Sequence, residues 1–97
     1  LVDVKSNGPF LGSSIAQVNP KFIDDLNLPL KSKGVVLTQV SNLSRRLGLR
    51  EADIIASING AEISSVDALL SVNSARIKVW SLDVIRDKRL ITIRFAI

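Results

Sequence analysis

The sequence of 97 residues contains neither cysteine nor histidine. Without cysteine, the chain has no disulfide framework and no thiolate metal ligand. Without histidine, it lacks the usual general base at neutral pH, the commonest metal ligand and every Ser-His-Asp arrangement. We therefore expect no catalytic residue, no metal site and no cofactor in this chain. No serine in it is expected to act as a nucleophile, because none has a base to activate it.

Aromatic residues and long apolar runs are scarce as well. Aromatic residues make up 4% of the sequence, as three phenylalanines and one tryptophan. The net charge is +4, but a nucleic-acid surface needs its basic residues in a stripe with aromatics for stacking, and here they are scattered. No apolar run approaches the roughly 20 residues that a membrane-spanning helix needs. The sequence predicts neither nucleic-acid binding nor membrane insertion.

The remaining composition is that of an ordinary folded domain. Hydrophobic residues make up 46% of the chain and charged residues 23%, which is typical of globular proteins. A chain of 97 residues is long enough for one domain with a single core. We expect one domain over residues 1–97, with residues 1–7 as a linker or N-terminal extension. The first residues lack a signal-peptide pattern, and we expect the chain to be a fragment of a longer protein.

Alternating apolar residues and turn signals predict about five strands and two helices, a small mixed α+β domain. The strands are expected at residues 14–18, 34–40, 53–58, 77–86 and 89–96, with a short return at 61–63. The helices are expected at residues 21–26 and 64–72, the second capped by a serine. Residues 41–46 are expected to form one irregular helical turn capped by Ser44, and Gly48 to end it in a left-handed conformation. The Asn59-Gly60 pair predicts a hairpin turn in which both residues have positive φ.

One stretch, residues 8–18, is a tight loop around Gly12 that leads directly into an alternating strand. A loop of this kind can leave backbone N–H groups pointing outward as a nest for an anion, most simply a carboxylate. The strand at residues 14–18 has two interpretations. Its edge accepts an incoming extended peptide, or it is covered by another part of the parent protein.

Four stretches together carry a resemblance to a known family. Residues 10–13 match a carboxylate-binding loop, and residues 34–40 match a Gly-Val-Val strand. Residues 47–60 match a GL-x-x-GD-x-I-x-x-ING signature, and residues 63–69 match the start of a groove helix. In this order the chain resembles a PDZ domain, more narrowly the circularly permuted PDZ domain of bacterial HtrA-type serine proteases of the DegP and DegQ kind. The Pro9-Phe10 opening and the segment from Arg76 to Trp80 look most like the second, C-terminal PDZ domain of such proteases.

The resemblance implies a small, partly open β-barrel or sandwich that binds peptides. By the resemblance, the peptide-binding residues are Phe10, Leu11, Gly12, Ser13, Ser14, Ile15, Val66, Leu70 and Asn73. Helical periodicity places Val66 and Leu70 on one side, as the wall of the groove, and Leu69 mainly in the core. Asn73 either reaches the far end of a peptide or ends its helix. Ser13 stands where the family has an apolar side chain, which implies a shallower or more polar pocket.

The function implied by the resemblance is capture of C-terminal tails or extended hydrophobic segments of substrate or regulatory proteins by β-augmentation. The parent would be a periplasmic, trypsin-like serine endopeptidase with its catalytic domain upstream. Two alternatives stay open. The domain serves assembly by docking onto neighbouring PDZ or protease domains of an oligomer, or it belongs to an intramembrane metalloprotease or a secretion component.

Overall fold

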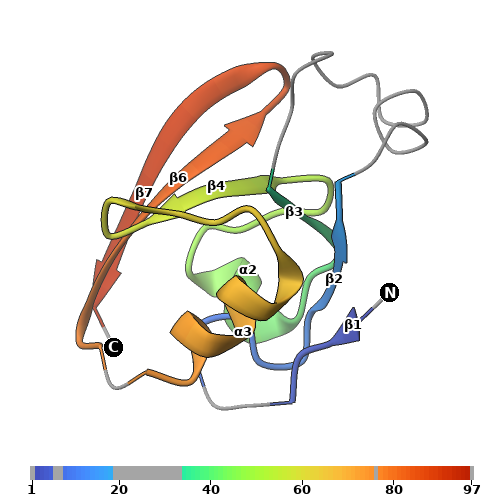
Figure 1. Cartoon of the computed structure of the whole chain (residues 1–97), viewed down its shortest axis with the longest axis vertical. Helices are drawn as coiled ribbons and strands as arrows, with labels where there is room; N and C mark the ends of the chain where they lie inside the picture. The colour runs from blue at the N-terminus through green and yellow to red at the C-terminus, as the bar shows by residue number, and fades with distance from the viewer. Residues whose placement is uncertain (1, 6–7, 19–33, 76, 97) are drawn as a thin grey trace.

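A computed structural model of the chain describes residues 2–5, 8–18, 34–75 and 77–96, and this part of the chain forms one antiparallel sheet with two helices (Figure 1). The elements in chain order are β1 (Val2–Asp3), β2 (Ser14–Gln17), β3 (Val35–Gln39), α2 (Asn42–Arg46), β4 (Ile54–Ile58), β5 (Ala61–Glu62), α3 (Val66–Asn73), β6 (Val79–Arg86) and β7 (Arg89–Ala96). The strands lie side by side in the order β1-β2-β3-β4-β6-β7, and β5 pairs with β4. The sheet is therefore open, with β1 at one end and β7 at the other.

The strands predicted from the sequence are confirmed to within two residues at each end. The helix predicted at residues 64–72 is confirmed as α3, whereas the one predicted at residues 21–26 lies outside the described residues. Within residues 1–7, which were expected to be a linker or N-terminal extension, the structure has the strand β1 paired with β2. This strand has no counterpart in the prediction from sequence.

The cap of α2 corrects one prediction. Ser41, not Ser44, caps this helix: its backbone is extended, with φ −70° and ψ 165°, and its hydroxyl accepts the N–H of Ser44. A capping residue must stand outside the helix, and Ser44 lies within it. The cap of α3 is a serine, as predicted, and the structure identifies it as Ser65, whose hydroxyl accepts the N–H of Ala68 at 3.1 Å.

Two predicted turns are confirmed by their backbone angles. Asn59 and Gly60 have φ of 50° and 83°, so both positions of the hairpin turn are left-handed. Gly48 follows α2 with φ of 103°. In both places glycine adopts an angle that other residues take only with strain.

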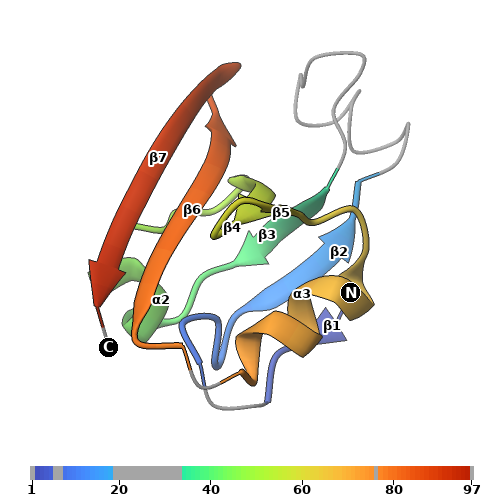
Figure 2. The ribbon, with the colours of Figure 1, turned by 60° about the vertical axis from the view of Figure 1, so that its left-hand side comes forward.

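The main core cluster takes buried side chains from β2, β3, β4, β6 and α3 and from the loops between them. Figure 2 shows how the β6–β7 hairpin stands across from the strands β2 and β3. The largest side chain of the cluster is that of Trp80, which is buried and stacks on Phe95 with ring centroids 6.3 Å apart. The Trp80 indole N–H donates to the carbonyl oxygen of Ile77 at 2.9 Å, so its polar atom is satisfied. Trp80 is thus a packing residue of the core.

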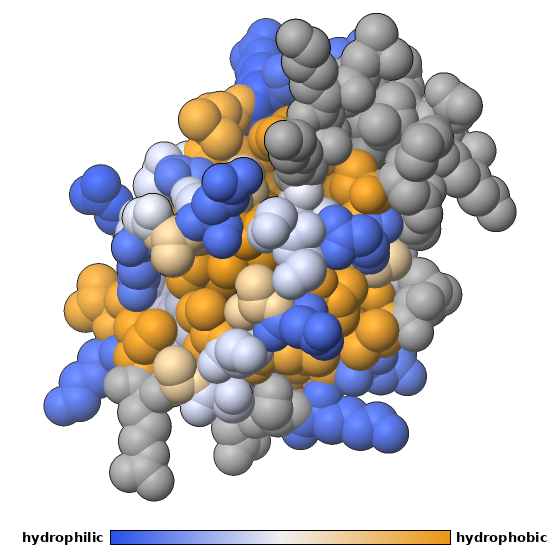
Figure 3. Space-filling view, viewed as in Figure 1, coloured by the Kyte–Doolittle hydropathy of each residue, from blue (hydrophilic) through white to orange (hydrophobic). Residues whose placement is uncertain are grey.

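On the face shown in Figure 3, hydrophilic side chains stand apart from one another around apolar surface and form no continuous stripe. The helices of the described residues are five and eight residues long, and none is long and apolar enough to cross a membrane.

Candidate functional site

The loop of residues 8–13 leads into β2 and is folded by two hydrogen bonds of its own. The N–H of Leu11 donates to the carbonyl oxygen of Gly8 at 3.2 Å, and the N–H of Ser13 donates to that of Phe10 at 3.0 Å. Gly12 has φ of 84°, a left-handed angle that lets the loop turn into the strand. The predicted tight turn at Gly12 is thus present.

The amides of Gly12 and Phe10 donate to groups outside the loop. The N–H of Gly12 donates to the carbonyl oxygen of Val4 at 2.9 Å. The N–H of Phe10 donates to Oδ1 of Asn73, the last residue of α3, at 3.0 Å. Every amide from Phe10 to Ser13 therefore has an acceptor within the chain.

Asn73 holds the loop against the end of α3. Its side chain is fully buried, and the loop packs so closely on it that a Cβ atom added to Gly8 would lie 2.1 Å from its backbone oxygen. The sequence suggested a contact with the far end of a peptide or a helix terminator. The structure places Asn73 beside the predicted carboxylate loop instead of at the opposite end of β2, and it is also the last residue of its helix.

Three serines tie the loop to the start of α2. The buried hydroxyl of Ser13 donates to Oγ of Ser44 at 2.9 Å and accepts the N–H of Ser41 at 3.0 Å. The Ser44 hydroxyl donates to the carbonyl oxygen of Pro9 at 2.6 Å. The Ser41 hydroxyl donates to the carbonyl oxygen of Leu11 at 2.8 Å. Buried hydroxyls need such partners. Sequence reasoning missed this cluster, although it noted that Ser13 departs from the family pattern.

The edge of β2 that faces away from β3, here called the β2 edge, is paired with β1. Val2 lies opposite Ile15 and Asp3 opposite Ser14, in antiparallel register. The Ser14 hydroxyl donates to Oδ1 of Asp3 at 2.6 Å. The sequence left open whether this edge accepts a peptide or is covered. In the structure it is covered, by β1 of the same chain.

Helix α3 contributes apolar side chains beside the β2 edge, and α3 contacts β2. Leu69 is fully buried, as predicted, while Val66 and Leu70 are partly buried and pack against the same core cluster. Val4, only 2% exposed, belongs to this cluster together with Ile15. Residues from the N-terminal segment, β2 and α3 thus share one apolar cluster.

Two carboxylates of the described residues, those of Asp53 and Asp83, are held by hydrogen bonds. Asp53 is 1% exposed and binds Arg86 through both carboxylate oxygens, at 2.8 Å to Nε and 2.6 Å to Nη2. The hydrogen bonds to Asp53 raise the pKa of Arg86 above its usual value. Hydrogen bonds from Ser57 and Thr92 lower the pKa of Asp83. Within the described residues, no group of three or more acidic side chains could hold a metal ion.

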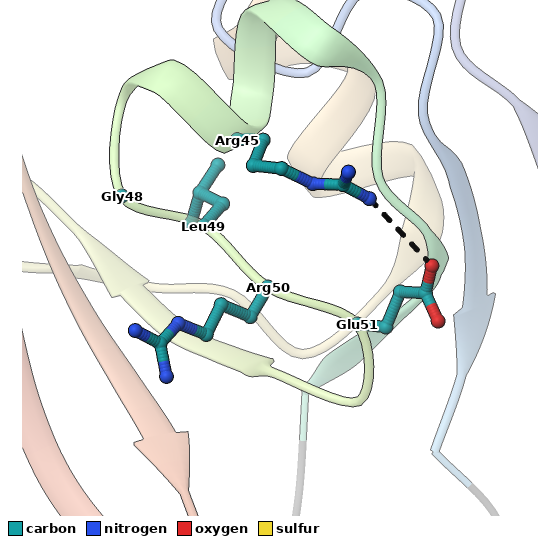
Figure 4. A pocket seen from close by; sticks show the side chains of 5 residues that line it. All are labelled: Arg45, Gly48, Leu49, Arg50 and Glu51. Carbon is teal, nitrogen blue, oxygen red and sulfur yellow. Dashed lines mark ion pairs between the residues drawn. The ribbon is translucent and has the colours of Figure 1, made fainter.

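An open hollow of about 690 Å³ lies elsewhere, at the turn that follows α2 (Figure 4). It is lined by Arg45, Gly48, Leu49, Arg50 and Glu51. Arg45 and Glu51 point toward each other with 3.9 Å between Nη2 and Oε1, and both side chains are mostly exposed. None of the residues predicted to bind peptide lines this hollow, and an exposed pair at this distance contributes little to stability.

No family model and no curated protein matches the sequence. Solved structures do match, and they show that the chain has a PDZ fold. The HtrA-type protease AlgW with a decapeptide matches at TM-score 0.75 and 21% identity, over 86% of this chain and 26% of that chain. The HtrA3 PDZ domain bound to a phage-derived ligand, FGRWV, matches at TM-score 0.75 and 22% identity, over 90% of this chain and 83% of that one.

A third match is the PDZ domain of EpsC from Vibrio cholerae, at TM-score 0.58 and 20% identity, over 88% of this chain and 77% of that one. The predicted fold class, a partly open α+β PDZ fold, is confirmed. This chain spans about a quarter of the AlgW chain, 26%.

Proposed function

We propose that this chain is a peptide-binding PDZ module of an HtrA-type protease, which captures C-terminal tails or extended hydrophobic segments of substrate or regulatory proteins at the β2 edge. The observation that carries the proposal is the pairing of β2 with β1, directly after which the carbonyl oxygen of Val4 lies 2.9 Å from the Gly12 nitrogen. This is the geometry in which β-augmentation supplies affinity through main-chain hydrogen bonds. AlgW and HtrA3, two proteins with this fold, were solved with peptide ligands.

The nine residues predicted to bind peptide have different roles in this proposal. Gly12 presents its amide to a terminal carboxylate, Leu11 and Ser13 form the turn that orients this amide, and Phe10 and Asn73 fix the position of the loop. Ser14 and Ile15 pair with the main chain of the peptide. Val66 and Leu70 contact its side chains from α3.

The parent, in this proposal, is a periplasmic serine endopeptidase whose catalytic domain precedes the present chain. The likeness to AlgW, of which this chain spans 26%, supports a place in such a protein. The match to the PDZ domain of EpsC is weaker, with a TM-score of 0.58 against 0.75 for AlgW. The sequence of the parent protein separates the serine protease from the metalloprotease and secretion-component alternatives: a Gly-Asn-Ser-Gly-Gly run upstream identifies the serine protease.

Titration of the ¹⁵N-labelled chain with the peptide Phe-Gly-Arg-Trp-Val, followed by NMR, tests peptide binding directly. We expect the amide signals of residues 11–17 to move on addition of the peptide with a free C-terminus. Signals that stay in place at millimolar peptide, both with β1 on the β2 edge and with β1 removed from it, would refute the proposal. The assembly alternative predicts instead that the domain binds other domains of its parent with no response to free peptide.

A further inference from the structure

We propose that residues 2–4 of the chain act as an internal ligand of the β2 edge, so that an external peptide binds only after displacing them. This inference rests on the proposed function, because it concerns the same site and specifies how access to it is regulated.

The first observation is that the β2 edge has room for one partner. A strand has two edges, and β3 pairs along one of them, from Gln17 opposite Val35 to Ser14 opposite Gln39. β1 lies along the other, as the end strand of the sheet (Figures 1 and 2). Paired strands lie about 4.8 Å apart, so β1 and an added peptide would occupy the same space. The two are mutually exclusive.

The second observation is that Val4 has the contacts of a ligand's terminal residue. Its N–H donates to the carbonyl oxygen of Ser13 at 2.8 Å, and its own carbonyl oxygen accepts the N–H of Gly12 at 2.9 Å. Its side chain is 2% exposed and packs in the cluster that contains Phe10 and Ile15. An apolar side chain in the core and an oxygen on a loop amide are what a C-terminal residue would present to this site.

The third observation is that this internal ligand is held weakly enough to be exchanged. The carbonyl group of Val4 is neutral, whereas the carboxylate of a free peptide forms stronger, charge-assisted hydrogen bonds. Val2 is 36% exposed and Asp3 is exposed, so Val4 supplies the one buried side chain of the segment. Its advantage is attachment to the domain, which gives it an effective concentration on the order of millimolar. A competing peptide can bind only to molecules whose β2 edge is free. Its apparent dissociation constant therefore equals the intrinsic one divided by the fraction of molecules with a free edge.

A disulfide that locks β1 onto β2 tests the inference in the full chain. The natural sequence has no cysteine, so the double variant Asp3→Cys with Ser14→Cys forms a single, defined bridge. Asp3 and Ser14 lie directly opposite each other in the register of β1 and β2. Hydrogen-bonded and non-hydrogen-bonded pairs alternate along an antiparallel ladder. Because the N–H of Val4 donates to Ser13, the next pair, Asp3 with Ser14, is a non-hydrogen-bonded one. Cα atoms of such a pair lie about 4.5 Å apart, within the range of disulfides.

We expect the oxidised double variant to bind fluorescein-labelled Phe-Gly-Arg-Trp-Val at least tenfold more weakly than the same protein after reduction, as measured by anisotropy. The single variants Asp3→Cys and Ser14→Cys are the matched controls, and reduction should leave their affinity unchanged. The lone tryptophan of the chain, Trp80, is buried and reports through its fluorescence that each form is folded before the labelled peptide is added.

Two further measurements do not depend on the bridge. Val4→Asp places a carboxylate at a position that is 2% exposed, which should expel the segment and tighten peptide binding at least threefold. In the unaltered chain, saturation with the peptide should make the amide of Val4 exchange its hydrogen faster while the amides of β2 exchange more slowly. Ligand binding ordinarily slows exchange, so a faster rate at Val4 is specific to displacement.

The outcomes separate this inference from the proposed function. If the oxidised and reduced double variants bind peptide equally well, or if peptide slows exchange at Val4, the internal-ligand inference is wrong and the binding function stands. If neither the unaltered chain, the reduced double variant nor a folded Val4→Asp variant binds any peptide, the proposed function is refuted, and the inference with it.

Discussion

The carbonyl oxygen of Val4 lies 2.9 Å from the backbone nitrogen of Gly12 and accepts its hydrogen bond. Gly12 belongs to the loop that the sequence assigns to a ligand's carboxylate, and Val4 belongs to a segment that the sequence assigns to no element. The loop is therefore preorganised around an oxygen atom supplied by the chain itself. A ligand with a free carboxylate replaces a neutral acceptor with a charged one at the same amide.

Gly12→Ala should destabilise the chain and disturb the loop. Its φ of 84° strains any residue with a Cβ atom by about 1–2 kcal/mol, and the added atom would lie 3.1 Å from Cβ of Ser41. Gly60→Ala is a matched control, because Gly60 has nearly the same φ, 83°, with nothing within 4 Å. Urea unfolding should give a larger loss for Gly12→Ala. Equal losses would mean that the contact with Ser41 relaxes without cost.

Ser13→Ile tests whether the loop needs its serine cluster. The family pattern has an apolar residue here, but in this chain Ser13 bonds to Ser44 Oγ and to the Ser41 N–H. Removing the hydroxyl leaves buried polar groups unpaired, at about 1–3 kcal/mol, and the larger side chain adds strain. We expect unfolding at lower denaturant than for Ser71→Ala, an exposed serine of α3. A stability equal to that of the natural chain would argue against the cluster.

Arg86→Ala should cost about 3–5 kcal/mol, because it leaves the carboxylate of Asp53 buried without its cation. With distances of 2.8 and 2.6 Å and 1% exposure of Asp53, this ion pair is shorter and more buried than that of Arg45 with Glu51. Arg45→Ala removes an arginine from an exposed pair at 3.9 Å and should cost less than about 1 kcal/mol. Chemical denaturation of the two variants gives the comparison, and similar losses would contradict it.

Acid should weaken the fold in part through Asp83. The hydrogen bonds from Ser57 and Thr92 lower the folded-state pKa of Asp83 below that of the unfolded chain. The contribution to stability is therefore complete above the unfolded pKa, about 3.9, and is lost as the pH falls through the lower folded value. An NMR titration of the Asp83 side chain in the Ser57→Ala, Thr92→Val double variant should show a higher pKa than in the natural chain. An unchanged pKa would exclude these hydrogen bonds as its cause.

The sheet follows from the sequence because its signals are local. Alternation of apolar residues specifies the strands, and the Asn59-Gly60 pair needs only its own positive φ values, 50° and 83°, to form the turn. The division of α3 into the buried Leu69 and the flanking Val66 and Leu70 follows from helical periodicity in the same way.

The arrangement around the site depends on partners far apart in the chain. β1 is two residues long, too short for an alternating pattern, and it forms because the β2 edge offers hydrogen bonds. Ser13 meets its serine partner 31 residues further on, and Asp53 meets Arg86 after 33. A polar residue in an apolar pattern indicates that it has a hydrogen-bond partner in the folded chain. Which residue is that partner depends on how the backbone folds.

The amide signal of Gly12 provides the most direct test of the account. The ¹⁵N-labelled chain is titrated with Phe-Gly-Arg-Trp-Val carrying either a free or an amidated C-terminus. We predict that the free acid moves the Gly12 signal and that amidation weakens binding about 10- to 100-fold, the loss of one charge-assisted hydrogen bond of about 1.5–3 kcal/mol. A Gly12 signal that stays fixed at millimolar free acid, or equal affinity for the two peptides, would contradict a carboxylate site at this loop.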